Sequence, residues 1–493
     1  MTRSQALAHG IQKNLHMTLR RTFRLARLRT AVLLVLALVP LALAACTPEN
    51  PQSTFDADGP IAELQANLFI YIFWLAVVVF VVVEGALIYS ILRFRSRRNA
   101  DLPAQTHGNT RLEVIWTLIP VVILVAIAIP TLEGIYETDS PASADENTTM
   151  TVDIYGHQWW WEAAYPGEAV VTANEIHIPT DTWVDFRLHS DDVIHSFWVP
   201  KLGGKVDVIP DDDNRVPLKA DEPGVYYGQC AEFCGVAHAN MRFRVVAQPR
   251  EEFQDWLAEH RRPPKPIQDN PDATDGRQLF QQNCATCHSM NLGRIGDVSE
   301  ERDLQESRQS AFESQREASL LFPGPNLTYL SQRSTLGAGL VEMNRENLIS
   351  WIADPDEIKV ETRMKELAEP YRNNSLSRED ATKIAEYLLA MEPQEPGEEP
   401  TNGGQNGSPE ERGETVFAEN CSQCHSTGTD DRVGPGLGDL FEEHDEAYVR
   451  ESILDPNAEI AEGFDSPSAM PGNFEQQLSD QELDDLIEYL RTL

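Results

Sequence analysis

The sequence predicts a multidomain fold: a two-helix transmembrane hairpin, then one all-β domain, then two all-α domains. Three observations lead to this prediction. Two long apolar runs lie between residues 68 and 132, short alternating runs follow as far as residue 246, and the rest of the chain repeats one helical plan. At 493 residues the chain has room for about three globular units besides the hairpin.

Charge is spread unevenly along the chain. The formal net charge of −38 makes a nucleic-acid binder improbable, because the phosphate backbone attracts basic surfaces. The hydrophobic share of 41% argues against wholesale disorder. Residues 1–50 hold seven basic residues and one acidic, whereas residues 401–493 hold 22 acidic and four basic. The two ends are therefore predicted to face different compartments or partners.

The first 45 residues have the pattern of a secretory signal. Five arginines, from Arg20 to Arg29, precede an apolar run that ends in Leu43-Ala44-Ala45-Cys46, which resembles a bacterial lipoprotein cleavage site. We expect residues 1–45 to be a removed signal peptide and Cys46 to carry a lipid anchor outside the cytoplasm. The alternative is a retained first helix anchored from the cytoplasm.

Residues 46–135 are predicted to contain the membrane hairpin, with helices at about 68–92 and 112–132. The first apolar run has Glu84 as its only charge, and both runs can span a bilayer. The loop between them holds five arginines and one aspartate, which places it in the cytoplasm and everything after about residue 134 outside. A buried hairpin of a soluble protein would not need runs this long and this apolar.

The next predicted domain, residues 136–260, reads as all-β. Its short runs alternate in polarity and are broken by Pro, Gly and Asp, as in a β-sandwich or barrel. The expected strands are 150–155, 170–178, 183–188, 195–199, 224–227 and 241–246.

Two all-α domains complete the chain, at residues 271–392 and 411–493. Linkers rich in Pro, Gly or Glu, residues 261–270 and 393–410, precede them. Each domain begins with a Gly-x-x-x-Phe helix and ends with an amphipathic helix containing Glu-Tyr-Leu, which indicates an internal duplication. The first domain holds a polar insert, residues 291–321, to which the sequence assigns no role.

The seven cysteines favour cofactor chemistry over a disulfide framework. Cys284-Ala-Thr-Cys287-His288 and Cys421-Ser-Gln-Cys424-His425 both match Cys-x-x-Cys-His, the covalent attachment pattern of c-type haem. The two thiols can reach the two vinyl groups, and the adjacent imidazole then lies under the iron. A disulfide, a thioredoxin-like motif and zinc are the alternatives, and zinc would need two further ligands at matching spacing. We expect two covalently bound haems.

Each haem iron needs a second axial ligand, commonly a methionine. After His425 the chain has a single methionine, Met470. After the first motif the candidates are Met343, Met364 and Met391. We assign Met364 because it lies in a predicted loop five residues after Lys359, a spacing that small c-type cytochromes often show. Core packing is the expected role of the other two.

A second metal signature lies in the predicted β domain. Cys230, Cys234, His238 and Met241 fall within twelve residues, and His195 lies upstream on a predicted strand. Soft thiolate and thioether ligands with imidazole select copper. A mononuclear blue-copper site would leave one thiolate over, whereas two thiolates can bridge two coppers. Zinc on two Cys and two His is the competing interpretation, and it leaves Met241 without a role.

These motifs give the chain a family resemblance. Residues 60–248 resemble cytochrome c oxidase subunit II, with its membrane hairpin and its cupredoxin-like domain that holds the binuclear copper centre CuA. The C-terminal half resembles the fused cytochrome c domains of caa-type haem–copper oxidases, here in a two-haem form. The resemblance implies the electron-input subunit of a proton-pumping oxidase of the bacterial inner membrane. Electrons would pass from an external donor through two haems c and CuA to haem a in subunit I, where oxygen is reduced to water.

The resemblance also assigns the copper ligands. Cys230 and Cys234 would bridge the two coppers. His195 and Met241 would complete one copper, and His238 with the backbone carbonyl of Glu232 the other. The Glu232 carboxylate would meet a magnesium ion shared with subunit I, and subunit III would be a further partner. The three aspartates after Pro210 depart from the usual Gly and basic residue, which bears on the contact with subunit I.

Two further roles follow from the resemblance. Trp159, in Gly156-His-Gln-Trp-Trp-Trp161, would be the residue where electrons enter, whereas Trp160 and Trp161 also suit packing roles. Glu113 matches the glutamate at the entrance of the K proton pathway, and otherwise it is a helix-end acid at the membrane interface.

Two rival functions stand beside this one. A nitric oxide reductase subunit that uses CuA is disfavoured by the fused haems and by Glu113. A free-standing haem lipoprotein that shuttles electrons or senses redox state is disfavoured by the hairpin. A quinol oxidase subunit II would lack the copper ligands. Residues 251–400, with 29 acidic and 16 basic residues, suit a basic donor such as a basic cytochrome c, or a salty environment.

Overall fold

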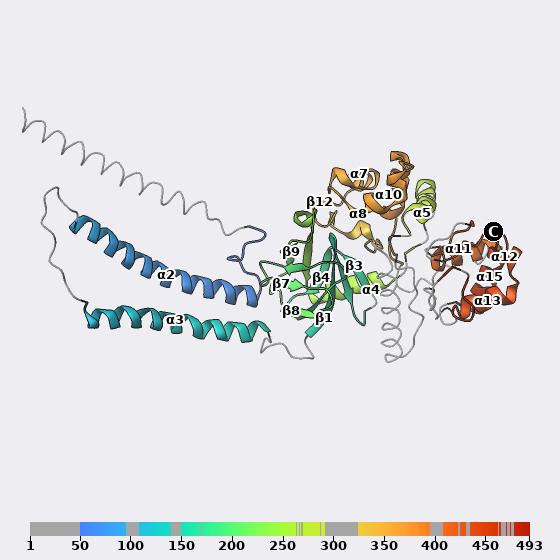
Figure 1. Ribbon diagram of the computed structural model, residues 1–493. Helices are drawn as coiled ribbons and strands as arrows, with labels where there is room; N and C mark the ends of the chain where they lie inside the picture. The colour runs from blue at the N-terminus through green and yellow to red at the C-terminus, as the bar shows by residue number, and fades with distance from the viewer. Residues whose placement is uncertain are drawn as a thin grey trace, which may run out of the picture.

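The computed structural model describes the chain from residue 50 to residue 493 with gaps. The described residues are 50–94, 108–139, 149–168, 170–262, 264–265, 267, 270–285, 287–290, 324–394, 408–422, 424–429, 434–461, 463–464, 470, 474 and 478–493. Figure 1 shows a helical hairpin at one end, a β domain in the middle and two helical domains beyond it. The predicted signal peptide, Cys46, the cytoplasmic loop after Phe94 and the insert 291–321 lie outside the described residues.

The hairpin consists of α2 (Pro60–Arg93) and α3 (Thr110–Asp139), both long and apolar enough to cross a membrane. Both helices exceed the apolar runs that predicted them, because their polar ends continue the same helix outside the apolar stretch. Pro60 begins α2, a position where its missing N–H costs nothing. The start of α2 is fixed to the β domain, since the Ala62 backbone N–H donates to Leu202 O and Lys201 pairs with Asp56 and Asp58.

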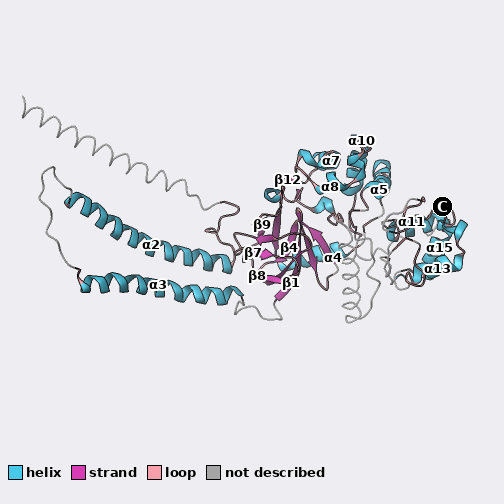
Figure 2. Ribbon diagram, in the orientation of Figure 1, coloured by secondary structure: helices cyan, strands magenta, loops and turns pink. Residues whose placement is uncertain are grey.

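The β domain is a sandwich of two five-stranded sheets, drawn in magenta in Figure 2. One sheet has the order β3-β2-β1-β5-β8 and the other β4-β10-β9-β6-β7. The strands are β1 (Thr149–His157), β2 (Trp160–Tyr165), β3 (Val170–Ala173), β4 (Glu175–Pro179), β5 (Trp183–Ser190), β6 (His195–Trp198), β7 (Val206–Val208), β8 (Asn214–Leu218), β9 (Gly224–Cys230) and β10 (Arg242–Gln248). Helix α4 (Arg250–Arg261) follows and packs against β3, β4 and β10.

Every predicted strand is present in the structure. Three further strands were not predicted, and one predicted run forms two strands. Strand β2 was not predicted, because all six of its residues are buried and its sequence therefore does not alternate. The short strands β7 and β8 were also not predicted, and β8 contains a proline. The run 170–178 divides into β3 and β4 at Asn174, whose φ of 62° turns the chain between the two sheets.

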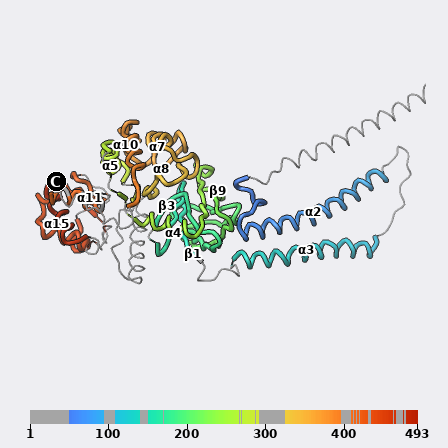
Figure 3. The backbone as a smooth tube through the Cα atoms, turned by 180° about the vertical axis from the view of Figure 1, so that it is seen from behind, coloured from blue at the N-terminus to red at the C-terminus, as the bar shows by residue number. Residues whose placement is uncertain are grey.

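The first all-α domain contains α5 (Pro271–Asn283), α7 (Arg345–Ala353), α8 (Arg363–Leu367), α9 (Glu369–Arg372) and α10 (Arg378–Leu389). The second contains α11 (Pro409–Asn420), α12 (Leu440–Glu443), α13 (Glu446–Leu454) and α15 (Asp480–Leu490). Each domain has its own buried apolar cluster, as the predicted duplication requires. In the view from behind, the second domain again lies at the end of the molecule opposite the hairpin (Figure 3).

The glycine of each Gly-x-x-x-Phe helix lies where the first and last helices of its domain cross. A Cβ on Gly276 would lie 1.9 Å from Lys383 O, and one on Gly413 would lie 1.9 Å from Asp485 O. Only a residue without a side chain permits this approach of α5 to α10 and of α11 to α15. The phenylalanine four residues on, Phe280 or Phe417, is buried in the domain core.

Gly413→Ala is therefore expected to destabilise the second all-α domain. The added methyl group would collide with backbone, which cannot rotate away, so we expect a loss of about 1–3 kcal/mol or more. Thermal unfolding of that domain measures the loss. Gly428→Ala is the control, because a Cβ there meets no atom within 4 Å. Equal stability of the two variants would contradict this account of the helix crossing.

Candidate metal centre and haem sites

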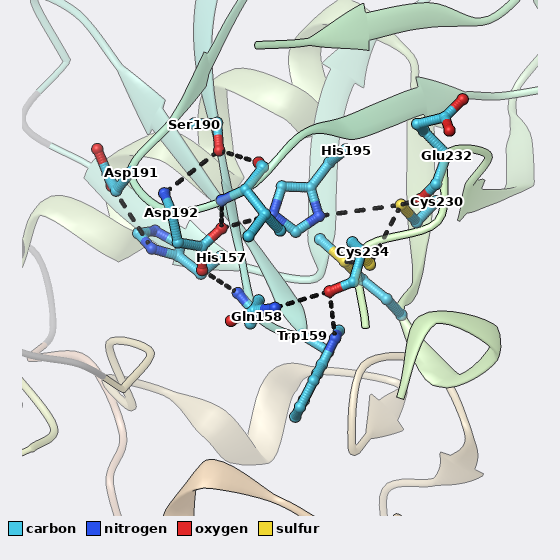
Figure 4. A network of polar contacts seen from close by, with 12 residues as sticks. His157, Gln158, Trp159, Ser190, Asp191, Asp192, His195, Cys230, Glu232 and Cys234 are labelled. Carbon is cyan, nitrogen blue, oxygen red and sulfur yellow. Dashed lines mark hydrogen bonds and ion pairs between the residues drawn. The ribbon is translucent and has the colours of Figure 1, made fainter. Parts of the chain in front are cut away.

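The sandwich brings together five of the predicted copper-binding residues. Cys230 ends β9, Cys234 and His238 lie in the following loop, Met241 immediately precedes β10, and His195 begins β6. The sulfur atoms of Cys230 and Cys234 are 3.8 Å apart (Figure 4). Cys230, Cys234 and His195 are buried, and their ligand atoms lie within 4.8 Å of one another. The loop is thus folded with its donor atoms already facing one point.

The remaining donors surround the sulfur pair. His195 Nδ1 lies 3.9 Å from Cys230 Sγ, and His238 Nδ1 lies 3.6 Å from Cys234 Sγ. Met241 Sδ is 3.8 Å from Cys234 Sγ, and the backbone oxygen of Glu232 is 3.2 Å from Cys230 Sγ. This set of two thiols, two imidazoles, a thioether and a carbonyl fits two copper ions bridged by sulfur. A single zinc would leave the buried thioether unused.

The electrostatics of the centre favour metal binding through sulfur. The hydrogen bond between the two thiols lowers the pKa of Cys230 to about 3 and raises the pKa of Cys234. The pair therefore readily gives up its first proton, and a bound metal would displace the second. This arrangement is chemically suited to binding a cation through sulfur.

Asp192 is a residue that the sequence did not single out. Its Oδ1 lies 2.8 Å from His195 Nε2, on the side of the ring away from the sulfur atoms. Burial lowers the pKa of His195, but its hydrogen bonds to Asp192 and Cys230 outweigh this and raise it overall. A carboxylate behind a metal-binding imidazole fixes the tautomer and the ring orientation. The i, i+3 spacing to His195 was the signal available in the sequence.

The three consecutive tryptophans have different surroundings. Trp159 is half-buried, and its indole Nε1 donates to Cys234 O at 3.0 Å, while the neighbouring Gln158 Nε2 donates to the same oxygen at 2.7 Å (Figure 4). Trp160 stacks on His157, and Trp161 is fully buried against Phe197 and Phe243. Of the three, Trp159 is the one whose indole is hydrogen-bonded to a residue of the sulfur pair.

The other predicted site residues of the oxidase part lie further out. The Glu232 side chain is exposed and points away from the sulfur pair, in keeping with a contact to a partner subunit (Figure 4). Glu113 lies in the first turn of α3 and is exposed. The Asp211–Asp213 turn is exposed as well, and Asp213 pairs with His189 at 3.0 Å.

The first haem-attachment motif lines an apolar cavity that is partly open to solvent. Cys284, Cys287, His288 and Met364 all contribute to its wall. The cavity is also lined by residues of the β domain, namely Gln158, Trp159, Trp160, Ala173 and Asn174. A large apolar cavity with two thiols and an imidazole on one wall fits a covalently attached haem.

The imidazole of each Cys-x-x-Cys-His motif is oriented by a backbone carbonyl. His288 Nδ1 lies 2.9 Å from Pro325 O, and His425 Nδ1 lies 2.8 Å from Pro435 O. A hydrogen bond to the carbonyl leaves Nε2 of each ring as the ligand atom. A Cβ on Gly324 would lie 2.7 Å from His288 Cε1, and one on Gly434 would lie 2.5 Å from His425 Cε1. Gly324 and Gly434, each of which precedes a proline, therefore leave space for the imidazole that a side chain at either position would occupy.

The candidate axial methionines lie in different places. Met364 lines the first cavity, whereas Met343 and Met391 belong to the core cluster of the domain, with Met391 buried. In the second domain Met470 and Cys421 are both partly buried and pack against the same core cluster. Both assignments, Met364 and Met470, stay predictions.

Met364→Leu is expected to keep the covalent haem and to lower the reduction potential of that haem. A methionine ligand raises the potential, so its loss should shift it down by on the order of 0.1 V. Spectroscopic redox titration of the whole oxidase measures the shift. Met343→Leu is the control, because that side chain packs outside the cavity. A shift with Met343→Leu and none with Met364→Leu would reverse the assignment.

Comparison with known proteins gives the family. The models for the cytochrome c oxidase subunit II transmembrane domain and periplasmic domain match residues 48–133 and 168–248, and the cytochrome c model matches residues 273–392 and 410–493. The chain is 34% identical over 369 residues to cytochrome c oxidase subunit 2 of Alkalihalophilus pseudofirmus, covering 73% of this chain and 96% of the relative. This chain belongs to the cytochrome c oxidase subunit II family. It is a subunit of an oxidoreductase complex.

Further similarities lie within this family and its neighbours. Cytochrome c oxidase subunit 2 of Bacillus subtilis is 33% identical, over 68% of this chain and 91% of the relative. Quinol oxidase subunit 2 of Bacillus cereus is 32% identical, over 47% of this chain. A crystal structure of the periplasmic domain of subunit II of cytochrome oxidase from Bradyrhizobium japonicum is 31% identical, covers 22% of this chain and 92% of that chain, and has a TM-score of 0.22.

Membership of this oxidase family confirms several predictions. The order of membrane hairpin, cupredoxin-like domain and two cytochrome c domains is the predicted fold class. Two apolar helices and a periplasmic domain fit a membrane protein whose C-terminal part lies outside the cytoplasm. Haem c and CuA are the cofactors that these domains suggest.

Proposed function

We propose that this chain is the electron-input subunit of a proton-pumping cytochrome c oxidase. It would accept electrons from an external donor, conduct them through its two haem c domains and its CuA domain, and deliver them to haem a of subunit I, where oxygen is reduced to water. The observation that carries the proposal is the convergence of Cys230, Cys234, His195, His238 and Met241 on one buried point. A quinol oxidase subunit has no use for such a donor set.

Each domain would supply the ligands of one cofactor. Cys230 and Cys234 would bridge two coppers, so that each electron is shared by both metals and little needs to move when it arrives. His195, His238, Met241 and the Glu232 carbonyl would complete the ligand set, with the Glu232 carboxylate reaching magnesium at the contact with subunit I. Cys284, Cys287, His288 and Met364 would hold one haem, and Cys421, Cys424, His425 and Met470 the other.

Further parts of the proposal concern the membrane and the partners. Glu113, near the loop that we place in the cytoplasm, would stand at the entrance of the K proton pathway. The complex would include subunits I and III, with the chain crossing the inner membrane twice and held by a lipid at Cys46. The acidic haem domains suit a basic donor, because opposite charges speed encounter at low ionic strength.

Purification of the complex with its cofactors tests the proposal. We expect the chain to co-purify with a large haem–copper subunit, to carry two haems c and two coppers, and to support oxygen reduction. Metal analysis, a reduced-minus-oxidised spectrum and an oxygen electrode measure these three properties. A preference for nitric oxide as acceptor, purification without a haem–copper subunit, or a mononuclear copper signal would each refute the proposal.

A further inference from the structure

A buried carboxylate of the β domain holds the first cytochrome c domain. Glu175 begins β4 and is 3% exposed. Its carboxylate accepts four hydrogen bonds from the first cytochrome c domain, two from the backbone N–H and hydroxyl of Ser334 and two from those of Thr335, at 2.7–3.0 Å. A buried carboxylate with four donors is fully satisfied only while the two domains stay together.

A second set of hydrogen bonds joins the same two domains, with backbone carbonyls of the first cytochrome c domain as acceptors. The Arg242 N–H donates to Ala338 O at 3.2 Å, and Arg244 Nη2 donates to Gly339 O at 3.1 Å. Ala338 is buried against Trp160 and Ala173 of the β domain. The first cytochrome c domain thus covers Trp160 of β2 and Ala173 of β3.

Lys359 reaches across this interface to the tryptophan beside the copper ligands. It is 5% exposed, and its Nζ donates to Trp159 O at 2.5 Å. Trp159 in turn donates from Nε1 to Cys234 O at 3.0 Å. Lys359 and Trp159 both line the cavity of the first haem motif. A continuous bonded path therefore runs from the wall of this cavity to a residue of the sulfur pair.

The Lys359 amine is buried and therefore needs a hydrogen-bond partner. That partner, Trp159 O, belongs to the β domain. Burial lowers the pKa of Lys359 to about 7, and the amine can donate to Trp159 O whether or not it carries a charge. Since a lysine ammonium is ordinarily solvated, its placement here at an interface indicates a specific task and not surface solubility.

We propose that Lys359 is a positioning residue that fixes the first cytochrome c domain on Trp159, which makes that domain the permanent internal donor of the copper centre. The proposal rests on the proposed function and adds the order of the two domains within it. One electron leaves the first domain and one enters the copper domain in each transfer, with no bond or proton exchanged. The external donor is then kept off the Trp159 surface, because the first cytochrome c domain covers it, and must deliver its electron to a cytochrome c domain.

The test compares Lys359→Met with Lys383→Met in the purified oxidase. Methionine keeps the length of the side chain and removes the donor, and Lys383 is a lysine of the same domain that pairs with Asp275 away from the interface. Hydrogen–deuterium exchange reads the interface directly, without turnover. We expect Lys359→Met alone to lose protection at residues 157–161 and 334–340. Time-resolved reduction should show at least tenfold slower electron arrival at the copper centre, with an unchanged KM for the external donor.

The opposite results overturn the proposal. Unchanged exchange and unchanged transfer in Lys359→Met would show that the lysine positions nothing. A raised KM for the external donor with normal internal transfer would show that the donor docks at Trp159. If Lys359→Met does not fold, Glu175→Gln gives the same exchange readout at the interface through a residue that does not itself line the cavity. Absence of haem or copper from the unmodified complex would refute the proposed function, whereas normal cofactors with an unprotected interface would refute this inference alone.

Discussion

Cys234→Ser is expected to leave the copper domain folded but without a binuclear centre. Under the proposed function the variant loses one of the two sulfur atoms that would be shared by both metals, and serine is a poor soft ligand. Even partners behind a metal ligand change affinity or activity by 10–100-fold, so we expect oxygen consumption to fall by about 100-fold or more. Copper analysis and electron paramagnetic resonance of the purified complex measure the loss, and both haems should remain.

Two companion variants make this prediction specific. His189→Gln removes an imidazole of the same domain that pairs with Asp213 and is stacked on Tyr155, and it should keep both coppers. Asp192→Asn keeps the ligand set but weakens the hydrogen bond behind His195, so an intermediate loss of about 10–100-fold is expected. Retention of a normal binuclear signal in Cys234→Ser would rule out the proposed bridging role.

Removing the thiols of either haem motif is expected to remove one haem and leave the other. The two domains have separate cores and separate proximal imidazoles, so Cys421→Ala with Cys424→Ala should give one haem per chain and a normal first domain. Cys284→Ala with Cys287→Ala should also give one haem per chain, and it should stop electron delivery to copper. Covalent haem content and reduction kinetics with the external donor measure these effects.

The control for the haem prediction is Cys46→Ala, which lies in neither motif and should keep both haems. Loss of both haems from either double variant would mean that the two domains depend on each other for assembly. Normal copper reduction without the first haem would contradict the domain order inferred above.

Local patterns in the sequence were sufficient to predict the cofactors and the membrane hairpin. The haem motifs and the Cys230–Met241 segment carry most of their predicted ligands within a few residues of one another, so their spacing and the family resemblance indicated the cofactors. The length and apolarity of residues 68–92 and 112–132 indicated the hairpin for the same reason, since a membrane imposes a length that can be counted. The duplicated plan of the last two domains was visible as repeated glycines and phenylalanines.

Long-range pairings were decided by the tertiary structure. Glu175 and Ser334 are 159 residues apart, and Lys359 and Trp159 are 200 apart, so no periodicity could pair them. Strand β2 was missed because all its residues are buried, and Trp160 at its start is covered by Ala338 of the first cytochrome c domain. The contact of Asp192 with His195 could be related to the sulfur pair only through the pairing of β6 with β9, which brings His195 beside Cys230.

The sequence by itself therefore indicated which cofactors this protein is suited to bind, because many of the predicted ligands lie close together in the chain. Only the tertiary structure decided which cytochrome c domain lies on the copper domain, because that depends on surfaces formed after each domain has folded. The buried contacts of Glu175, Arg244 and Lys359 are what join the first cytochrome c domain to the copper domain.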